Sequence, residues 1–149
     1  MKNPCSIAIV GAGLIGQRHA EAIANAEKAR VCAIIDPSEA AKDFAQRLGV
    51  NWFADLGDFL AGEKPEGIIV ATPNQLHMKN VLVTIEAGIP TLVEKPIAAD
   101  VTSAKRMVEA ASSAHVPLLV GHHRRHNPLV QNARETIASG QIGEIVVVN

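Results

Sequence analysis

Residues 6–16 read SIAIVGAGLIG, an apolar stretch that runs directly into a glycine-rich turn. The apolar part, Ser6–Val10, predicts a buried β-strand. The glycines that follow have the spacing GxGxxG, and a helical pattern comes after them. Gly11 permits a tight turn, Gly13 lets a pyrophosphate approach the backbone, and Gly16 lets the helix pack close to the sheet. The stretch therefore predicts a strand, a phosphate-binding turn and a helix.

The next part of the chain extends this prediction to a dinucleotide. The helix expected over Leu14–Ala26 offers the free N–H groups of its first turn, where Leu14 and Ile15 lie, to the phosphates. The second apolar run ends in Asp36, 20 residues after Gly16, where a carboxylate can bind an adenosine ribose and repel a 2′-phosphate. NAD is therefore favoured over NADP. The alternative is a plain glycine turn followed by an N-capping Asp.

The rest of the chain alternates short apolar runs with helical patterns. Expected strands are Ser6–Val10, Arg30–Ile35, Asn51–Phe53, Gly67–Val70, Pro90–Val93, Val116–Val120 and Ile145–Val148. Expected helices are Leu14–Ala26, Ser38–Leu48, Asp55–Ala61, Asn74–Ala87, Val101–Ala114 and Pro128–Ser139. Continuously apolar strands suit a sheet covered on both faces, so the pattern predicts the α/β class with a doubly wound, mostly parallel sheet, a Rossmann fold.

The last expected strand sets the domain organisation. Ile145–Val148 has no later strand to pair with and would leave an exposed edge. We therefore expect a dinucleotide-binding domain over residues 1–121. Residues 122–149 are then a crossover helix and a first strand leading to a C-terminal α/β substrate domain, so the chain is expected to be a fragment cut near a domain boundary.

Composition excludes several classes of function. The chain is 48% hydrophobic and 19% charged with a net charge of -1, and only 3% of its residues are aromatic, which argues against a nucleic-acid partner. No apolar run is long enough for a membrane span, and the first residues lack the pattern of a cleaved leader. Cys5 and Cys32 fit small thiols in a reducing compartment. We expect a cytoplasmic protein.

Polar residues follow the later strands at the edge where ligands bind in doubly wound sheets. Residues 71–77 read ATPNQLH, in which Thr72 suits an N-cap, Pro73 the first helical position and Gln75 a capping box. The imidazole of His77 then touches a ligand or serves the structure. Further on, Glu94 and Lys95 end a strand and must point to opposite sides of an extended chain. They are either a solvated pair or groups aimed into the cleft.

The order GxGxxG, acidic strand end, ATPNxxH, EKP and basic turn resembles the glucose–fructose oxidoreductase / inositol dehydrogenase / rhizopine-catabolism (Gfo/Idh/MocA) family over nearly the whole chain. The resemblance implies that Lys95 is the catalytic lysine near nicotinamide and substrate, that Glu94 lies near the nicotinamide, and that the Lys95–Pro96 bond is cis. It also implies cofactor contacts from Ala71, Thr72, Pro73, Asn74 and His77. Arg125 matches the recurrent arginine of the family's basic turn, and it either contacts substrate or cofactor or serves the structure of the crossover. Members of the family carry a second α/β domain that completes the substrate pocket.

The histidines outside these motifs have less specific sequence contexts. His122, His123 and His126 lie within five residues, but the two arginines among them oppose a bound cation and no Cys or carboxylate joins them. No metal is therefore expected. In the first helix, His19 is expected to pack or hydrogen-bond against the sheet.

The leading hypothesis is the NAD-binding part of an oxidoreductase that transfers a hydride between nicotinamide and a polyol, sugar or related hydroxy compound. The fragment alone is expected to bind NAD weakly and to be inactive, and the longer protein to form a homo-oligomer. One alternative is an NAD(H) sensor without catalysis, which has no need for Lys95. Another is an S-adenosyl-dependent methyltransferase, against which the complete GxGxxG and the EKP argue.

Overall fold

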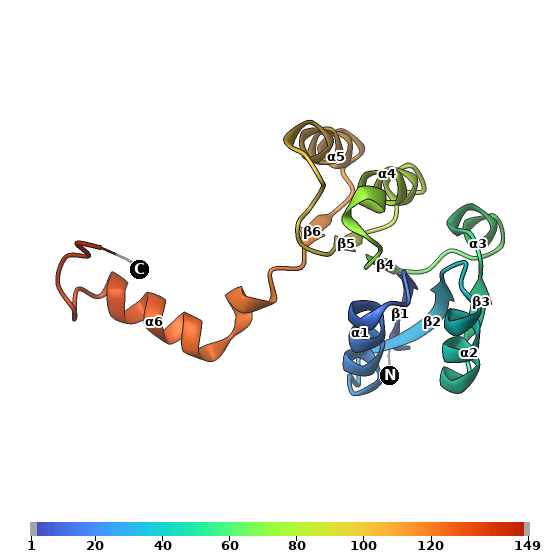
Figure 1. The fold of residues 1–149 in the computed structure, drawn as a ribbon, viewed down its shortest axis with the longest axis horizontal. Helices are drawn as coiled ribbons and strands as arrows, with labels where there is room; N and C mark the ends of the chain where they lie inside the picture. The colour runs from blue at the N-terminus through green and yellow to red at the C-terminus, as the bar shows by residue number, and fades with distance from the viewer. Residues whose placement is uncertain (1–2, 148–149) are drawn as a thin grey trace.

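The structure, a computed structural model, describes residues 3–147 and contains one six-stranded sheet (Figure 1). Every neighbouring pair of strands is parallel, in the order β3-β2-β1-β4-β5-β6. The strands are β1 Cys5–Val10, β2 Ala29–Ile35, β3 Asn51–Phe53, β4 Gly67–Val70, β5 Thr91–Val93 and β6 Leu118–Val120. The helices are α1 Leu14–Ala24, α2 Glu39–Leu48, α3 Leu56–Gly62, η1 Asn74–Leu76, α4 His77–Glu86, α5 Val101–Ala114, η2 His123–His126 and α6 Pro128–Ala138.

Two apolar cores cover the two faces of the sheet, as the continuous apolar strands predicted. Ile9 and Ile34 point to the face that α1 and α2 cover, where Phe44 packs. Ala8 and Val10 point to the other face, where α3, α4 and α5 pack. The doubly wound Rossmann fold is thereby confirmed. The chain reverses its winding direction between β1 and β4, so the loops after these neighbouring strands open a crevice at the carboxyl edge.

Local capping explains where several helices begin. Ser38, Asp55 and Asp100 are N-caps whose side chains accept hydrogen bonds from backbone amides in the first turns of α2, α3 and α5. At the other end of α2, Gly49 adopts the left-handed conformation with φ of 68° that closes the helix. These caps fix where the helices begin and end, and so limit the lengths of the loops between strands and helices.

The end of the described chain departs from the prediction. The strand expected over Ile145–Val148 is wrong for residues 145–147, which belong to no strand, and Val148 lies outside the described residues. A strand needs a hydrogen-bonding neighbour, and the sheet ends at β3 and β6. Figure 1 shows α6 projecting away from the sheet, and its apolar residues Leu129 and Val130 are exposed. Within residues 3–147, no helix has the length and apolarity that crossing a bilayer requires.

Candidate functional site

The glycine turn has the geometry that the spacing predicts. Gly11 has a φ of +96°, and a Cβ there would lie 2.7 Å from the backbone of Ala71. A Cβ on Gly16 would overlap the carbonyl oxygen of Gly11, so α1 could not approach the turn. A Cβ on Gly13, by contrast, would meet nothing within 4 Å. The turn is therefore packed tightly on its inner side and open at Gly13, which is the shape that a pyrophosphate requires.

Free backbone donors face this open side. Gly13 is the N-cap of α1 and supplies no side-chain hydrogen bond, so the first-turn amides at Leu14 and Ile15 have no intrahelical acceptor. The side chains of these two residues are exposed. The N-terminus of α1 can thus bind an anion through N–H groups and the helix dipole.

Asp36 follows β2 and is tied to the glycine turn. Its carboxylate accepts hydrogen bonds from the Ala12 amide at 2.9 Å and from the Ser38 amide and hydroxyl at 2.9 and 2.6 Å. Burial favours the neutral acid, but these hydrogen bonds outweigh it and lower the pKa of Asp36. The carboxylate is therefore ionised at neutral pH, and a carboxylate has about four acceptor positions, so room remains for a ribose hydroxyl.

A cavity of about 300 Å³, the aspartate cleft, opens beside this carboxylate. Residues after β1, β2, β3 and β4 and from the start of α4 line it, among them Gly11, Asp36, Pro37, Asp55, Thr72, Pro73, Lys79 and Asn80. Trp52 lies next to it, since its indole N–H donates to the carbonyl of Asp36 at 2.9 Å. The cleft therefore combines apolar walls with the carboxylate of Asp36, and Asp55, the N-cap of α3, also lines it, an arrangement that suits an adenosine. Lys79 is a lining residue that the sequence patterns did not single out, because it comes one helical turn into α4.

The loop after β4 follows a different geometry from the predicted capping box. Pro73, with no side-chain cap, precedes a 3-10 turn over Asn74–Leu76, and α4 begins only at His77. Thr72 is not an N-cap: its hydroxyl accepts from the Asn80 side chain at 3.3 Å. The extended backbone of Pro73, with ψ of 142°, delays the helix. The predicted helix over residues 74–87 is thus two elements.

The imidazole of His77 joins two of the strand-end loops. It is 1% exposed, and its ring nitrogens lie 2.8 Å from the Thr72 carbonyl oxygen and 3.0 Å from that of Pro96. A neutral imidazole has only one N–H to donate, so the two carbonyl groups compete for it. His77 therefore holds the loop after β4 against the turn after β5, while one side of it borders a cavity.

That cavity, the lysine cleft, has a volume of about 190 Å³. Its lining residues come from the start of α1 and from the segments that follow β4, β5 and β6: Ile15, Ala71, Thr72, Asn74, His77, Glu94, Lys95 and His123. Lys95 is an exposed residue that borders this cleft together with Ile15 of the glycine motif. The Lys95–Pro96 peptide bond is cis, as the resemblance implied. Thr72 borders both clefts, so the two form one continuous edge.

Glu94 directly follows β5 and lines the lysine cleft together with Lys95. One carboxylate oxygen accepts a hydrogen bond from the His19 ring at 2.8 Å, and the other accepts from the Lys95 amide at 3.1 Å. The sequence patterns did not predict this contact, because His19 and Glu94 are 75 residues apart. His19 had been expected to hydrogen-bond against the sheet, and its partner is instead a side chain of the site.

The basic turn after β6 separates into two parts. His123 lines the lysine cleft, whereas Arg125 borders a different hollow with Gln131 and Arg134 of α6. The structure therefore does not bring Arg125 to the other predicted site residues. His123 could have been found by extending to β6 the strand-end rule that selected Lys95. Among residues 3–147, no group of three or more His, Cys, Asp or Glu side chains could hold a metal ion.

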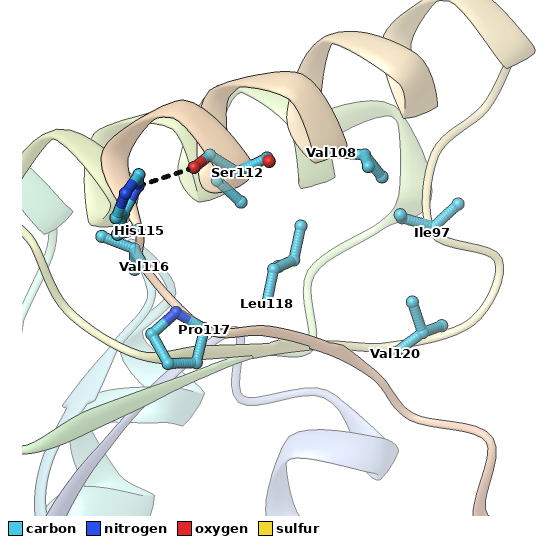
Figure 2. Close-up of a pocket in the computed structure, with 9 residues that line it drawn as sticks. Ile97, Val108, Ser112, His115, Val116, Pro117, Leu118 and Val120 are labelled. Carbon is cyan, nitrogen blue, oxygen red and sulfur yellow. Dashed lines mark hydrogen bonds between the residues drawn. The ribbon is translucent and has the colours of Figure 1, made fainter.

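A larger groove lies away from the strand ends, between α5 and the edge strand β6 (Figure 2). This α5 groove has a volume of about 440 Å³ and is lined by Ile97, Val108, Ala111, Ser112, His115, Val116, Pro117, Leu118 and Val120. Figure 2 shows apolar side chains pointing into it and His115 donating from Nδ1 to the Ser112 carbonyl. Its one ionisable side chain is already paired locally, so the groove offers no grouping for chemistry.

Comparison with known proteins gives an independent assignment. The family model described as "Oxidoreductase family, NAD-binding Rossmann fold" matches residues 5–122. Inositol 2-dehydrogenase of Corynebacterium glutamicum is 32% identical over 151 residues, which cover 99% of this chain and 45% of that protein.

Solved structures agree. The WlbA dehydrogenase from Bordetella pertussis in complex with NADH and UDP-GlcNAcA superposes with a TM-score of 0.90 at 31% identity, over 96% of this chain and 44% of that one. The scyllo-inositol dehydrogenase from Lactobacillus casei with bound NAD(H) and scyllo-inositol gives a TM-score of 0.90 at 25% identity, over 96% and 43%. The chain thus spans less than half the length of these relatives. The chain belongs to the GFO_IDH_MocA oxidoreductase family, and residues 5–122 form its NAD-binding Rossmann domain.

Proposed function

We propose that the chain is the cofactor-binding half of an NAD-dependent dehydrogenase that acts on a polyol, sugar or related hydroxy compound. One observation carries the proposal: Ile15 of the glycine turn, the loop after β4 and Lys95 line the same cleft. The named relatives include inositol dehydrogenases, one of them solved with NAD(H) and scyllo-inositol. A sensor without catalysis would bind NAD equally well but would have no use for the ammonium group in this position.

The open side of the glycine turn fits the group that the family implies. The turn leaves space at Gly13 for a pyrophosphate, the α1 amides face that space, and Asp36 borders a separate cleft for the ribose. Glu94, Lys95 and His77 would then lie at the nicotinamide end, with Ala71, Thr72, Pro73 and Asn74 between the two ends. For Arg125, which borders a different hollow, we propose a contact with substrate or with further chain.

Two residues of the lysine cleft, Lys95 and His77, have specific roles in this proposal. Bound NAD supplies the nicotinamide carbon that accepts or donates the hydride. The ammonium of Lys95 donates a hydrogen bond to the reacting oxygen of the substrate and shares in its proton transfer. The loop held by His77 keeps the turn that carries Lys95 in place. These residues orient the reactants and exclude water on one side.

We also propose that residues 122–149 lead into a second, substrate-binding domain, so that residues 1–121 and this segment belong to different parts of a longer protein. Three exposed apolar residues of α6 support this, namely Leu129 at 79%, Val130 at 47% and Ile137 at 42% exposure. A homo-oligomer is proposed through that domain. The free thiols of Cys5 and Cys32 fit the cytoplasm, which we propose as the location.

The test of the proposed function uses Lys95→Met in the longer protein. Loss of general acid–base assistance should lower turnover by about 10²–10⁴-fold while NAD affinity changes little. The matched control is Lys105→Met, which removes an exposed lysine of α5 that lines neither cleft and should leave turnover within a few-fold of wild type. Equal turnover for Lys95→Met and wild type would refute the role of Lys95. Turnover by the 149-residue chain alone would refute its assignment as half of an enzyme.

A further inference from the structure

The contact between His19 and Glu94 is a second feature of the lysine cleft that the proposed function does not use. The two side chains come from α1 and from the residue after β5, and their atoms Nε2 and Oε1 lie 2.8 Å apart. The His19 side chain is 24% exposed and that of Glu94 is 15% exposed. A carboxylate can only accept, so the imidazole carries its proton on Nε2 in this bond.

Three neighbours hold the Glu94 carboxylate. His19 binds one oxygen, the backbone amide of Lys95 binds the other at 3.1 Å, and Gly121 passes beside it. A Cβ on Gly121 would lie 2.9 Å from Oε1 of Glu94. The carboxylate thus packs between His19 of α1 and Gly121, which follows β6.

This arrangement makes the position of Glu94 depend on His19. A carboxylate that is mostly removed from water needs its hydrogen-bond donors, and the loss of one favours reorientation toward solvent. Glu94 lines the lysine cleft, whereas His19 does not, so any effect of His19 on a ligand passes through Glu94. The ionic character of the bond makes it stronger than a neutral one.

We propose that His19 is a positioning residue, which fixes the Glu94 carboxylate in the wall of the lysine cleft and so sets affinity for the nicotinamide end of the dinucleotide. The inference rests on the proposed function, because it takes this cleft as the nicotinamide end. It predicts an effect confined to that end, since the pyrophosphate and ribose contacts of the glycine turn and Asp36 do not involve His19.

Two ligands separate this role from a general loss of structure. NADH carries the nicotinamide and ADP-ribose lacks it. We expect His19→Leu to weaken NADH binding to the 149-residue chain by about ten-fold, the size of one hydrogen bond to a charged group, and to leave ADP-ribose binding within two-fold. His19→Gln keeps an N–H donor and should restore most of the NADH affinity. Arg18→Leu, at the exposed neighbouring position on α1, is the matched control.

Glu94 is the internal check. In a Glu94→Gln background the effect of His19→Leu on NADH binding should shrink to less than two-fold, because the partner charge is gone. If His19→Leu does not fold, Gly121→Ala replaces it: the added methyl displaces Glu94 without touching His19 and should weaken NADH selectively as well. Gly121 does not have a positive φ, so alanine is not strained there.

The outcomes distinguish a failure of the positioning role of His19 from a failure of the proposed function. An equal loss for both ligands, or the same loss in the Glu94→Gln background, overturns the positioning role and leaves the proposed function intact. Failure of the wild-type chain to bind either ligand overturns the proposed function itself. Calorimetric titration of each variant, with thermal melting to confirm folding, gives all of these results.

Discussion

The lysine cleft and the α5 groove are opposite kinds of cavity in one small domain. The groove is larger, at about 440 Å³ against about 190 Å³, and apolar side chains dominate it. The cleft is smaller, but the start of α1 and the segments that follow β4, β5 and β6 bring a lysine, a glutamate and two histidines to it. Volume therefore does not identify the site here. The convergence of strand ends does, because a parallel sheet places all of its loops on one edge.

The groove owes its existence to the edge of the sheet. The spacing of Val101, Ala104, Val108 and Ala111 predicts one buried face of α5, yet Val101 is 71% and Val108 53% exposed, and Met107 is buried instead. Since β6 is the last strand, the outer side of α5 has no further strand to cover. The α5 groove therefore lies where the sheet ends, whereas the lysine cleft lies where the loops after several strands converge.

The largest expected effect comes from closing the glycine turn. Gly16→Val would force a side chain into the Gly11 carbonyl, so α1 must move away from the sheet. We expect loss of measurable NAD binding and a clearly lowered melting temperature, followed by calorimetry and circular dichroism. Gly49→Val, at a helix end remote from both clefts, is also strained by its positive φ and should lower the melting temperature without abolishing NAD binding. Retained NAD affinity in Gly16→Val would contradict the claim that NAD binds at the glycine turn and not in the α5 groove.

The second effect concerns the aspartate cleft. Asp36→Ala removes the acceptor for the ribose hydroxyls and frees the Ala12 amide, so NAD affinity should fall by about 10- to 100-fold, as for one or two charged hydrogen bonds. Repulsion of a 2′-phosphate also disappears and Lys79 remains nearby, so the preference for NAD over NADP should shrink. Quenching of the fluorescence of Trp52, the single tryptophan, can be used to measure NADH binding. An unchanged ratio of the two affinities would remove Asp36 from the site.

A smaller effect follows from the lowered pKa of Asp36. Because the pKa in the folded state lies below the ordinary value of 3.8, the ionised carboxylate stabilises the fold above that pH. The stabilisation is lost as the pH falls through the folded-state pKa. Wild type should therefore melt a few degrees above Asp36→Asn at neutral pH, and the difference should close below about pH 3.8. A difference that is independent of pH would show that the hydrogen bonds to Ala12 and Ser38 are not the cause.

The smallest effect is expected in the groove. Val108→Asn changes an exposed lining residue of the α5 groove, and NAD affinity should stay within two-fold of wild type. Titration of this variant and of Asp36→Ala with NAD compares the loss of affinity caused by a change in each cavity. A loss in Val108→Asn comparable with that in Asp36→Ala would mean that the groove, and not the strand-end edge, carries the function.

Much of this arrangement could be predicted from the sequence, because each strand end is a local signal. The glycine spacing, the position of Asp36 and the EKP each follow an apolar run directly. The predicted capping at Thr72 is wrong because Pro73 adopts an extended backbone and a 3-10 turn intervenes before α4.

Long-range pairs were beyond local patterns. His19 meets Glu94 across 75 positions of the chain, and His123 reaches the cleft only because β6 lies beside β5. The strand expected at residues 145–147 needed a neighbour that the described sheet does not supply. Periodicity indicates what an element is, but the order of the strands decides which side chains share a cavity.

The most direct test is a crystal structure of the 149-residue chain with NAD⁺. The account predicts the pyrophosphate over the turn from Gly11 to Gly16, the adenosine ribose on Asp36 and the nicotinamide in the cleft beside Lys95. A dinucleotide seated in the α5 groove, or one whose nicotinamide points away from Lys95, would contradict it.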